Sequence, residues 1–231
     1  MAMRTRCTIK KDGAPMALNL TIRNETDADR RAVEELTREA FWNLYVPGCN
    51  EHYLVNVLRT HPDFIPELDF VAEYEGHIIG SILYAKSSVV DVKDPSRTFG
   101  TVSFGPVSVL PQYQRMGVGS ALIRHSLQKA RQIGYPAVII LGHPANYCMH
   151  GFKNGKDAGV CDGEGRYPYG LLALELREGV FKGGVWKYVP SDVYNLDETK
   201  AAVFDRGFTP LPKQYRHTQE EFLIACRAYL A

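Results

Sequence analysis

The stretch FGPVSVLPQYQRMGVGSALIRHSLQKARQIG, residues Phe104–Gly134, contains the features that decide the fold. An extended apolar segment reaches Pro111, and a polar turn with Gly117 and Gly119 leads into an amphipathic helix. The first N–H groups of a helix lack internal partners and carry partial positive charge, and glycine lets an anion approach the main chain. Arg115 adds a cation. The stretch therefore predicts a diphosphate-binding turn, although the two glycines also suit a purely structural turn.

Composition narrows the class of protein. Hydrophobic residues make up 45% of the 231 residues, charged residues 23%, and the net charge is +1, which leaves no basic footprint for nucleic acid. No apolar run approaches the ~18 residues of a membrane span. The basic N-terminus lacks the apolar core of a secretory signal. The five scattered cysteines are odd in number and favour a reducing compartment. We therefore expect a cytoplasmic protein with a flexible leader over residues 1–18.

Apolar periodicity predicts alternating elements along the chain. Glu75-Gly76 between two apolar runs predicts a hairpin turn. Helices are expected from about residue 26 to 40, over residues 51–59, after Gly119, as a short turn within residues 144–152, and in the tail. Strands are expected at residues 18–23, 68–73, 78–87, 99–109, 137–141, 171–176 and 184–188. No linker or repeat divides the chain, so we expect one domain.

Two motifs within this order of elements resemble those of a known family. The segment Gln114–Ser120 is similar to the Q/R-x-x-G-x-G/A signature of the GNAT superfamily of acyl-CoA-dependent N-acetyltransferases. Tyr147, four residues before Gly151-Phe152, resembles the family's Y-x-x-x-G-F. The resemblance implies an α/β (α+β) fold: a mixed, mostly antiparallel twisted sheet with a V-shaped splay between two central parallel strands, flanked by helices. It covers residues 19–190, and residues 191–231 resemble a C-terminal extension packed on the same domain.

The resemblance also implies an acetyl-CoA site. Gly105-Pro106 suits a bulge, after which the main chain is expected to pair with the pantetheine arm and polarise the thioester carbonyl. The pyrophosphate is expected on the amides of the glycine turn, and Asn146 is expected either to bind the cofactor or to cap a helix. The implied cofactor-binding residues are Val107, Ser108, Val109, Gln114, Arg115, Met116, Gly117, Val118, Gly119, Ser120 and Asn146.

The implied reaction is direct attack of a primary amine on acetyl-CoA in a ternary complex, with no metal. Tyr147 matches the family's general acid, which protonates the departing thiolate; a buried aromatic anchor is the other interpretation. The strand Phe99–Val109 contains no carboxylate, so the base is open: His143 is a candidate, as well as a structural histidine, and Asp69 and Glu73 lie on the preceding strand.

In the fold that the resemblance implies, the first helices cover the cleft. They contain aromatic and acidic residues that suit a cationic amine, or alternatively belong to the core. These candidate substrate residues are Phe41, Trp42, Tyr45, Glu51 and His52.

Two alternatives to a metal-independent acetyltransferase remain. Zinc is one, because His143, Cys148, His150 and Cys161 are typical ligand types, although their spacing is irregular. A non-catalytic acyl-CoA-binding sensor is the other, favoured by the missing strand carboxylate. The sequence leaves the acceptor, the acyl group and the choice between monomer and homodimer open, and it predicts neither a nucleic acid nor a membrane as a partner.

Overall fold

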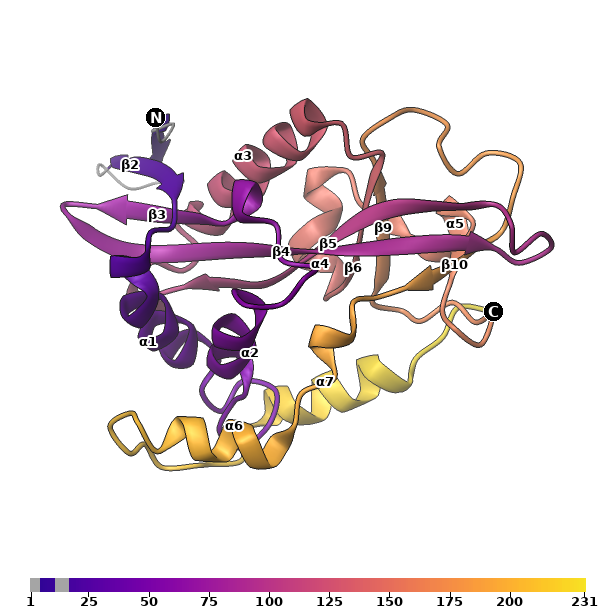
Figure 1. The fold of residues 1–231 in the computed structure, drawn as a ribbon. Coiled ribbons are helices and arrows are strands. Elements are labelled where there is room, and N and C mark those ends of the chain that lie inside the picture. Colours follow the sequence, from indigo (N-terminus) through magenta and orange to yellow (C-terminus); the bar gives the residue numbers. More distant parts are fainter. Residues whose placement is uncertain (1–4, 11–16) are drawn as a thin grey trace. The chain divides into compact units, whose positions relative to one another are not determined.

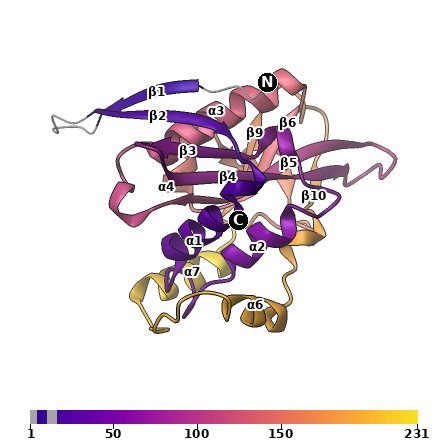
Figure 2. The same cartoon turned by 60° about the vertical axis from the view of Figure 1, so that its left-hand side comes forward.

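The computed structural model describes residues 5–10 and 17–231, and Figures 1 and 2 show its ribbon from two sides. The chain forms two compact units, each assembled from three segments that are separated in sequence. Strands β4 (His77–Asp91) and β5 (Thr98–Val109) contribute to both units, which explains why the sequence contains no linker. The first unit consists of Met1–Tyr84, Gly105–Ser126 and Val193–Gln219; the second consists of Ala85–Phe104, Leu127–Asp192 and Glu220–Ala231.

The first unit contains an antiparallel meander, in the strand order β1-β2-β3-β4. Strand β2 (Ala17–Asn24) pairs with β3 (Phe70–Tyr74), which pairs with β4 through a bulge after Ala72. The hairpin between β3 and β4 closes at the pair Tyr74↔His77, with Glu75 at φ 49° and Gly76 at φ 80°. Two left-handed residues match the twist of the strands, so the predicted Glu75-Gly76 turn is confirmed.

The N-terminal segment differs from the flexible leader expected over residues 1–18. Strand β1 (Thr5–Lys10) pairs antiparallel with β2, from Thr5↔Ile22 to Lys10↔Ala17. The Thr8 hydroxyl also donates a hydrogen bond to Asn19 Oδ1 at 2.9 Å. A six-residue strand has too short a pattern to stand out in the sequence, and it depends on β2 for its partner. Residues 1–4 and 11–16 of the expected leader lie outside the described residues.

Helices cover both faces of the first unit's strands. In both views α1 (Arg30–Phe41) and α2 (Glu51–Leu58) lie on one face of β3 and β4, and α3 (Val118–Ile133) lies on the other (Figures 1 and 2). The face of α3 predicted to be apolar is buried from Val118 to Ala130, whereas Ile133 is 43% exposed. Helix α6 (Glu198–Asp205) lies beside α2. The 3-10 turns of the chain are η1 (Asp27–Asp29), η2 (Pro66–Leu68), η3 (Pro111–Tyr113), η4 (Cys148–His150) and η5 (Asp192–Tyr194).

The second unit is built on β6 (Ala137–Leu141), which pairs parallel with β5 at Val102↔Val138 and antiparallel with β9 (Leu171–Glu175). Strand β7 (Lys153–Asn154) pairs with β9, and β10 (Trp186–Val189) pairs antiparallel with β4 and parallel with β8 (Val160–Cys161). The unit also contains α4 (Pro144–Tyr147), α5 (Gly155–Ala158) and most of α7 (His217–Arg227). The sheet is therefore mixed and mostly antiparallel, as predicted.

The C-terminal segment of the first unit packs against α1 and α2. Arg38 on α1 forms an ion pair with Asp205 at 2.7 Å and donates to the Thr209 carbonyl at 3.0 Å. Phe208 is 7% exposed; its ring contacts His52 edge-on at 5.0 Å, and the Arg31 guanidinium lies 3.7 Å above it. Phe208 therefore belongs to the core of the unit, whereas Tyr215 of the same segment is 69% exposed.

Replacing Phe208 with alanine is expected to lower the free energy of unfolding by about 3–5 kcal/mol, the usual cost of deleting a buried aromatic ring. Chemical denaturation measures this loss. Leu211→Ala is the matched control, because Leu211 is 42% exposed, and its effect is expected to stay within about 0.5 kcal/mol. Equal stability of the Phe208→Ala variant and the wild type would show that the tail does not support the fold.

Burial of His52 against Phe208 makes the stability of the fold depend on pH. Burial lowers the pKa of His52 to about 4, from the ordinary value of 6.5. Below pH 6.5 the unfolded chain therefore binds a proton that the folded chain excludes, and stability falls as the pH drops from about 6.5 to 4. The shift corresponds to about 3 kcal/mol. We expect the stability difference between wild type and His52→Gln to change over this pH range. The exposed His77→Gln is the control, and equal pH slopes for all three proteins would refute the assignment.

Candidate functional site

The turn before α3 contains two left-handed residues, Arg115 with φ 60° and Gly117 with φ 90°. Alternation of left-handed residues with their neighbours is typical of turns whose N–H groups bind an anion. The first helical hydrogen bond runs from the Ala121 N–H to the Gly117 carbonyl at 2.9 Å. The amides of residues 118–120 therefore lack helical acceptors, and the first turn contains no acidic residue. Such a turn binds an anion by geometry and by the helix dipole.

Packing beneath the turn fixes its position. The Gln114 side-chain amide donates to the Val109 carbonyl at 3.0 Å, and the Leu110 N–H donates to the Ile79 carbonyl at 3.0 Å. A Cβ on Gly80 would lie 3.1 Å from the Ser108 carbonyl oxygen and from side chains of α3. Gly80 therefore lets β4 approach the turn closely. Sequence reasoning missed it; a glycine inside an apolar strand is the available signal.

The predicted cofactor residues of the first unit occupy one strand end and the turn that follows it. Val107 and Val109 are half-buried, whereas Ser108 is fully buried and its hydroxyl bonds Thr37 Oγ1 at 2.9 Å. Arg115 is exposed, and within the described part of the chain it forms no ion pair. At Gly119 a Cβ would meet Val109 Cγ2 at an ordinary 3.6 Å. Packing around Gly119 therefore leaves room for a small side chain.

Tyr147 ends the short helix α4 in the second unit. His143 begins this helix as its N-cap: its Nδ1 accepts the Ala145 N–H at 3.3 Å. The half-buried Tyr147 ring lies 5.7 Å from the Phe104 ring and 6.1 Å from the Phe152 ring, measured between centroids. The predicted cofactor residue Asn146 is exposed on the same helix. The motif thus forms a local aromatic cluster that carries one phenol.

The structure restricts the candidate bases. With Nδ1 of His143 accepting a main-chain N–H, the neutral ring carries its proton on Nε2 and offers no free lone pair. Glu73 is ion-paired with Arg23 at 3.0 Å. Asp69 is buried, and burial raises its pKa well above the ordinary value, with the neighbouring Glu25 carboxylate adding to the rise. Asp69 and Glu73 are therefore engaged within the first unit.

The five candidate substrate residues separate into two groups. Phe41, Tyr45 and Glu51 are half-buried, and the rings of Phe41 and Tyr45 lie 5.9 Å apart. The Glu51 carboxylate accepts the Asn50 N–H at 3.0 Å, and burial raises its pKa. Burial also raises the pKa of Tyr45, and the charge of Glu51 adds to that rise. These three residues combine aromatic rings with a carboxylate.

Trp42 and His52 instead hold the tail. The Trp42 indole N–H donates to the Pro212 carbonyl at 3.0 Å, and the Arg38 guanidinium lies 4.2 Å from the indole ring. His52 is fully buried, with its Nε2 atom 3.1 Å from Asp205 Oδ1. Asn43, which the sequence did not single out, donates to the same Pro212 carbonyl at 3.0 Å. Its left-handed φ of 60° places the side chain for this contact.

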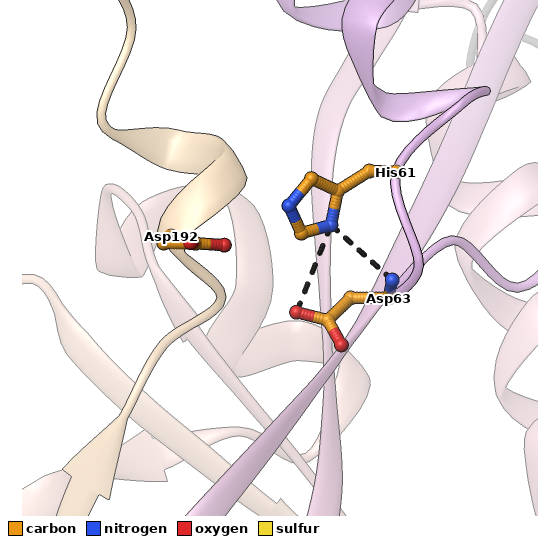
Figure 3. Close-up of side chains that lie close together, drawn as sticks. All are labelled: His61, Asp63 and Asp192. Atoms are coloured by element: carbon orange, nitrogen blue, oxygen red, sulfur yellow. Dashed lines mark hydrogen bonds and ion pairs between the residues drawn. The ribbon is translucent and has the colours of Figure 1, made fainter.

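The four residues of the zinc alternative do not assemble into a ligand set among the described residues. Cys161 is buried and directs its thiol at the Trp186 carbonyl at 3.5 Å, whereas Cys148 is exposed. Figure 3 shows another histidine, His61, whose Nδ1 accepts the Asp63 N–H at 3.2 Å and lies 3.7 Å from its carboxylate. Asp192, also drawn there, belongs to the second unit. Across the described residues, no helix combines the length and apolar composition needed to cross a membrane.

Comparison with known proteins identifies relatives. A sequence model of the acetyltransferase (GNAT) family matches residues 34–152. The uncharacterized N-acetyltransferase YjhQ of Escherichia coli K12 is 35% identical over 103 residues, which are 45% of this chain and 52% of YjhQ, so the match spans about half of that relative. The uncharacterized N-acetyltransferase YhbS of the same strain is 32% identical over 135 residues, which are 58% of this chain and 74% of YhbS.

Solved structures share the fold. The crystal structure of Escherichia coli YhbS in complex with CoA aligns with a TM-score of 0.64 and 22% identity, over 79% of this chain and 96% of that chain. A GNAT family acetyltransferase from Brucella melitensis in complex with acetyl-CoA aligns with a TM-score of 0.58 and 24% identity, over 76% and 97%. These likenesses confirm the predicted fold class. Because the family's sequence pattern covers half of the chain and its fold is present, the chain belongs to the acetyltransferase (GNAT) family.

Proposed function

We propose that this protein transfers the acetyl group of acetyl-CoA to a primary amine by direct attack in a ternary complex. The observation that carries the proposal is the open turn before α3, where Arg115 and Gly117 are left-handed and the amides of residues 118–120 lack helical acceptors. Membership of the acetyltransferase (GNAT) family supports the reaction type. Two relatives of the same fold have structures in complex with CoA or acetyl-CoA.

The first unit supplies the cofactor half of this proposal. The amides from Arg115 to Ser120 would hold the pyrophosphate, because they offer several N–H donors and the first turn of α3 contains no acidic residue. The main chain of Val107, Ser108 and Val109 would bind the pantetheine amides as an added strand does. A main-chain N–H near Val107 would polarise the thioester carbonyl. Asn146 belongs to the second unit and is exposed, and we assign it to the cofactor only through its place in the family's motif.

The reaction itself requires two proton movements. The neutral amine attacks the carbonyl carbon with its lone pair, a C–N bond forms, the C–S bond breaks, and the thiolate leaves. The attacking nitrogen loses one proton to solvent as the amide forms, and the thiolate gains one. We assign protonation of that thiolate to the Tyr147 hydroxyl, which stands at the family's acid position and is a donor at neutral pH. An alkyl ammonium has a pKa of ~10.4, so its deprotonation at pH 7 costs about 4–5 kcal/mol, and binding must favour the neutral amine.

We assign acceptor recognition to Phe41, Tyr45 and Glu51. The half-buried Glu51 carboxylate, whose charge acts on Tyr45, would attract a cationic amine, and the paired rings of Phe41 and Tyr45 offer it their faces. Burial raises the pKa of Glu51, which also suits it to share the proton that the ammonium gives up. We place the reaction in the cytoplasm, a location supported by the free thiols of Cys49, Cys148, Cys161 and Cys226.

Gly119→Asp is expected to weaken acetyl-CoA binding about tenfold or more, because the variant places a carboxylate where the pyrophosphate binds. Titration calorimetry measures the Kd. Gly119→Ala is the matched control: its Cβ would contact Val109 at 3.6 Å without strain, so near-normal affinity is expected. Unchanged affinity of the aspartate variant would contradict the assignment of the turn.

An assay for the free thiol of CoA tests whether the protein transfers the acetyl group. We expect the wild type to release thiol from acetyl-CoA at a rate that depends on the amine, across a panel of small amines, amino acids and lysine peptides. A non-catalytic acyl-CoA sensor is the second candidate, because β5 contains no carboxylate. Tight acetyl-CoA binding without turnover on any amine of the panel would favour the sensor.

Glu51→Gln is expected to raise the KM for the amine about tenfold or more, since a charged hydrogen bond of ~1.5–3 kcal/mol is lost. The KM for acetyl-CoA is expected to stay unchanged. Steady-state kinetics with the best amine of the panel measures both constants. Glu39→Gln, at an exposed position on α1, is the control. An unaltered amine KM would remove Glu51 from the acceptor site.

A further inference from the structure

Gly142 lies between the end of β6 and the start of α4, within the second unit. Its N–H donates to the Gly170 carbonyl at 2.9 Å, which fixes this part of the main chain beside the start of β9. A Cβ built on Gly142 would lie 2.5 Å from Cε2 of Tyr147, 3.1 Å from Cδ2 and 3.4 Å from Cζ. Side chains do not approach one another to 2.5 Å, so any residue larger than glycine requires the tyrosine ring to move.

Two buried aromatic rings restrict the movement of the Tyr147 ring. Phe104 and Phe152 are 6% and 3% exposed, and their rings are packed edge-on at 5.9 Å. Both contact the Tyr147 ring, at 5.7 and 6.1 Å. The helix that carries Tyr147 is fixed at its start by the His143 cap. The phenol is therefore enclosed by the Gly142 main chain and by two buried aromatic rings.

Backbone conformation does not account for glycine at this position. Left-handed glycines of the described residues include Gly117, Gly134 and Gly151, but Gly142 is not among them. An alanine at position 142 is therefore allowed by the backbone, and its only conflict is steric. Glycine is needed here for the space that the tyrosine ring occupies.

We propose that Gly142 is a positioning residue for Tyr147: the missing side chain lets the phenol lie against the main chain and sets the direction of its hydroxyl. The inference rests on the proposed role of Tyr147 as proton donor to the thiolate. Proton transfer requires a hydrogen bond of correct length and direction, so a displaced ring slows the chemical step. Acetyl-CoA binding through the Arg115–Ser120 amides does not involve Gly142. A side chain at position 142 is therefore expected to lower kcat and to leave the KM for acetyl-CoA nearly unchanged.

The test compares Gly142→Ala, Tyr147→Phe, the double variant and Gly163→Ala. Gly163 is the matched control, because a Cβ there has no atom within 4 Å and its φ is not left-handed. Thiol-release kinetics give kcat and the KM for acetyl-CoA. 19F NMR of protein labelled with 3-fluorotyrosine reports the ring position, and the Tyr147 resonance is identified as the one missing from Tyr147→Phe.

Gly142→Ala is expected to lower kcat about tenfold or more with little change in the KM for acetyl-CoA, and to shift the Tyr147 resonance. The double variant is expected to be as slow as Tyr147→Phe alone, because both changes remove the same contribution. Gly163→Ala is expected to match the wild type in all three measurements.

Two failures are distinguishable. If Tyr147→Phe retains the wild-type kcat, the assigned acid is wrong and the inference falls with it. If Tyr147→Phe is slow but Gly142→Ala retains both the wild-type kcat and an unshifted resonance, the acid stands and the positioning role is refuted. A double variant whose losses multiply also refutes it, because Gly142 would then act independently of Tyr147.

Discussion

The first unit depends on one constraint: the chain must leave β5, turn through two left-handed residues and begin α3 with its first amides unpaired. Gly117 makes the turn possible, since its φ of 90° disfavours any side chain. Gly80 makes it compact, because β4 can pack directly under the strand end and the helix. Gln114 closes it by satisfying the Val109 carbonyl. Strand, turn and helix therefore have one relative arrangement, and the amides of residues 118–120 are left without helical acceptors.

The acceptor side of the same unit depends on the tail. Arg38, at the centre of this contact, pairs with Asp205, donates to Thr209 and stacks on Trp42, so one buried cation joins α1 to three parts of the chain. Removal of the carboxylate would leave this cation buried without its charge partner. The tail thus holds Trp42 and His52 in place. Phe41, Tyr45 and Glu51 remain as the residues to which we assign recognition of the acceptor amine.

The sequence predicted the elements whose signals are local. The signature turn, the Glu75-Gly76 hairpin and the apolar face of α3 each occupy a short window, and the structure contains all three. The sequence could not predict that Trp42 binds the tail. Arg38 pairs with Asp205, which is 167 positions away, and nothing near Trp42 indicates that its indole will bind the Pro212 carbonyl. Strand β1 was not predicted for a related reason: its pairing with β2, rather than its own composition, makes it a strand.

Glycine occupies positions 117, 119 and 142 under different physical constraints, which the structure distinguishes. At Gly117 the backbone is left-handed, so conformation is the reason. At Gly119 a Cβ would make only an ordinary contact with Val109, so neither conformation nor packing demands glycine, and alanine fits this position. At Gly142 the backbone tolerates a side chain but the Tyr147 ring occupies its place. The atom that a Cβ would meet therefore distinguishes a glycine that alanine can replace from one that leaves room for a neighbouring side chain, a distinction that sequence alone does not contain.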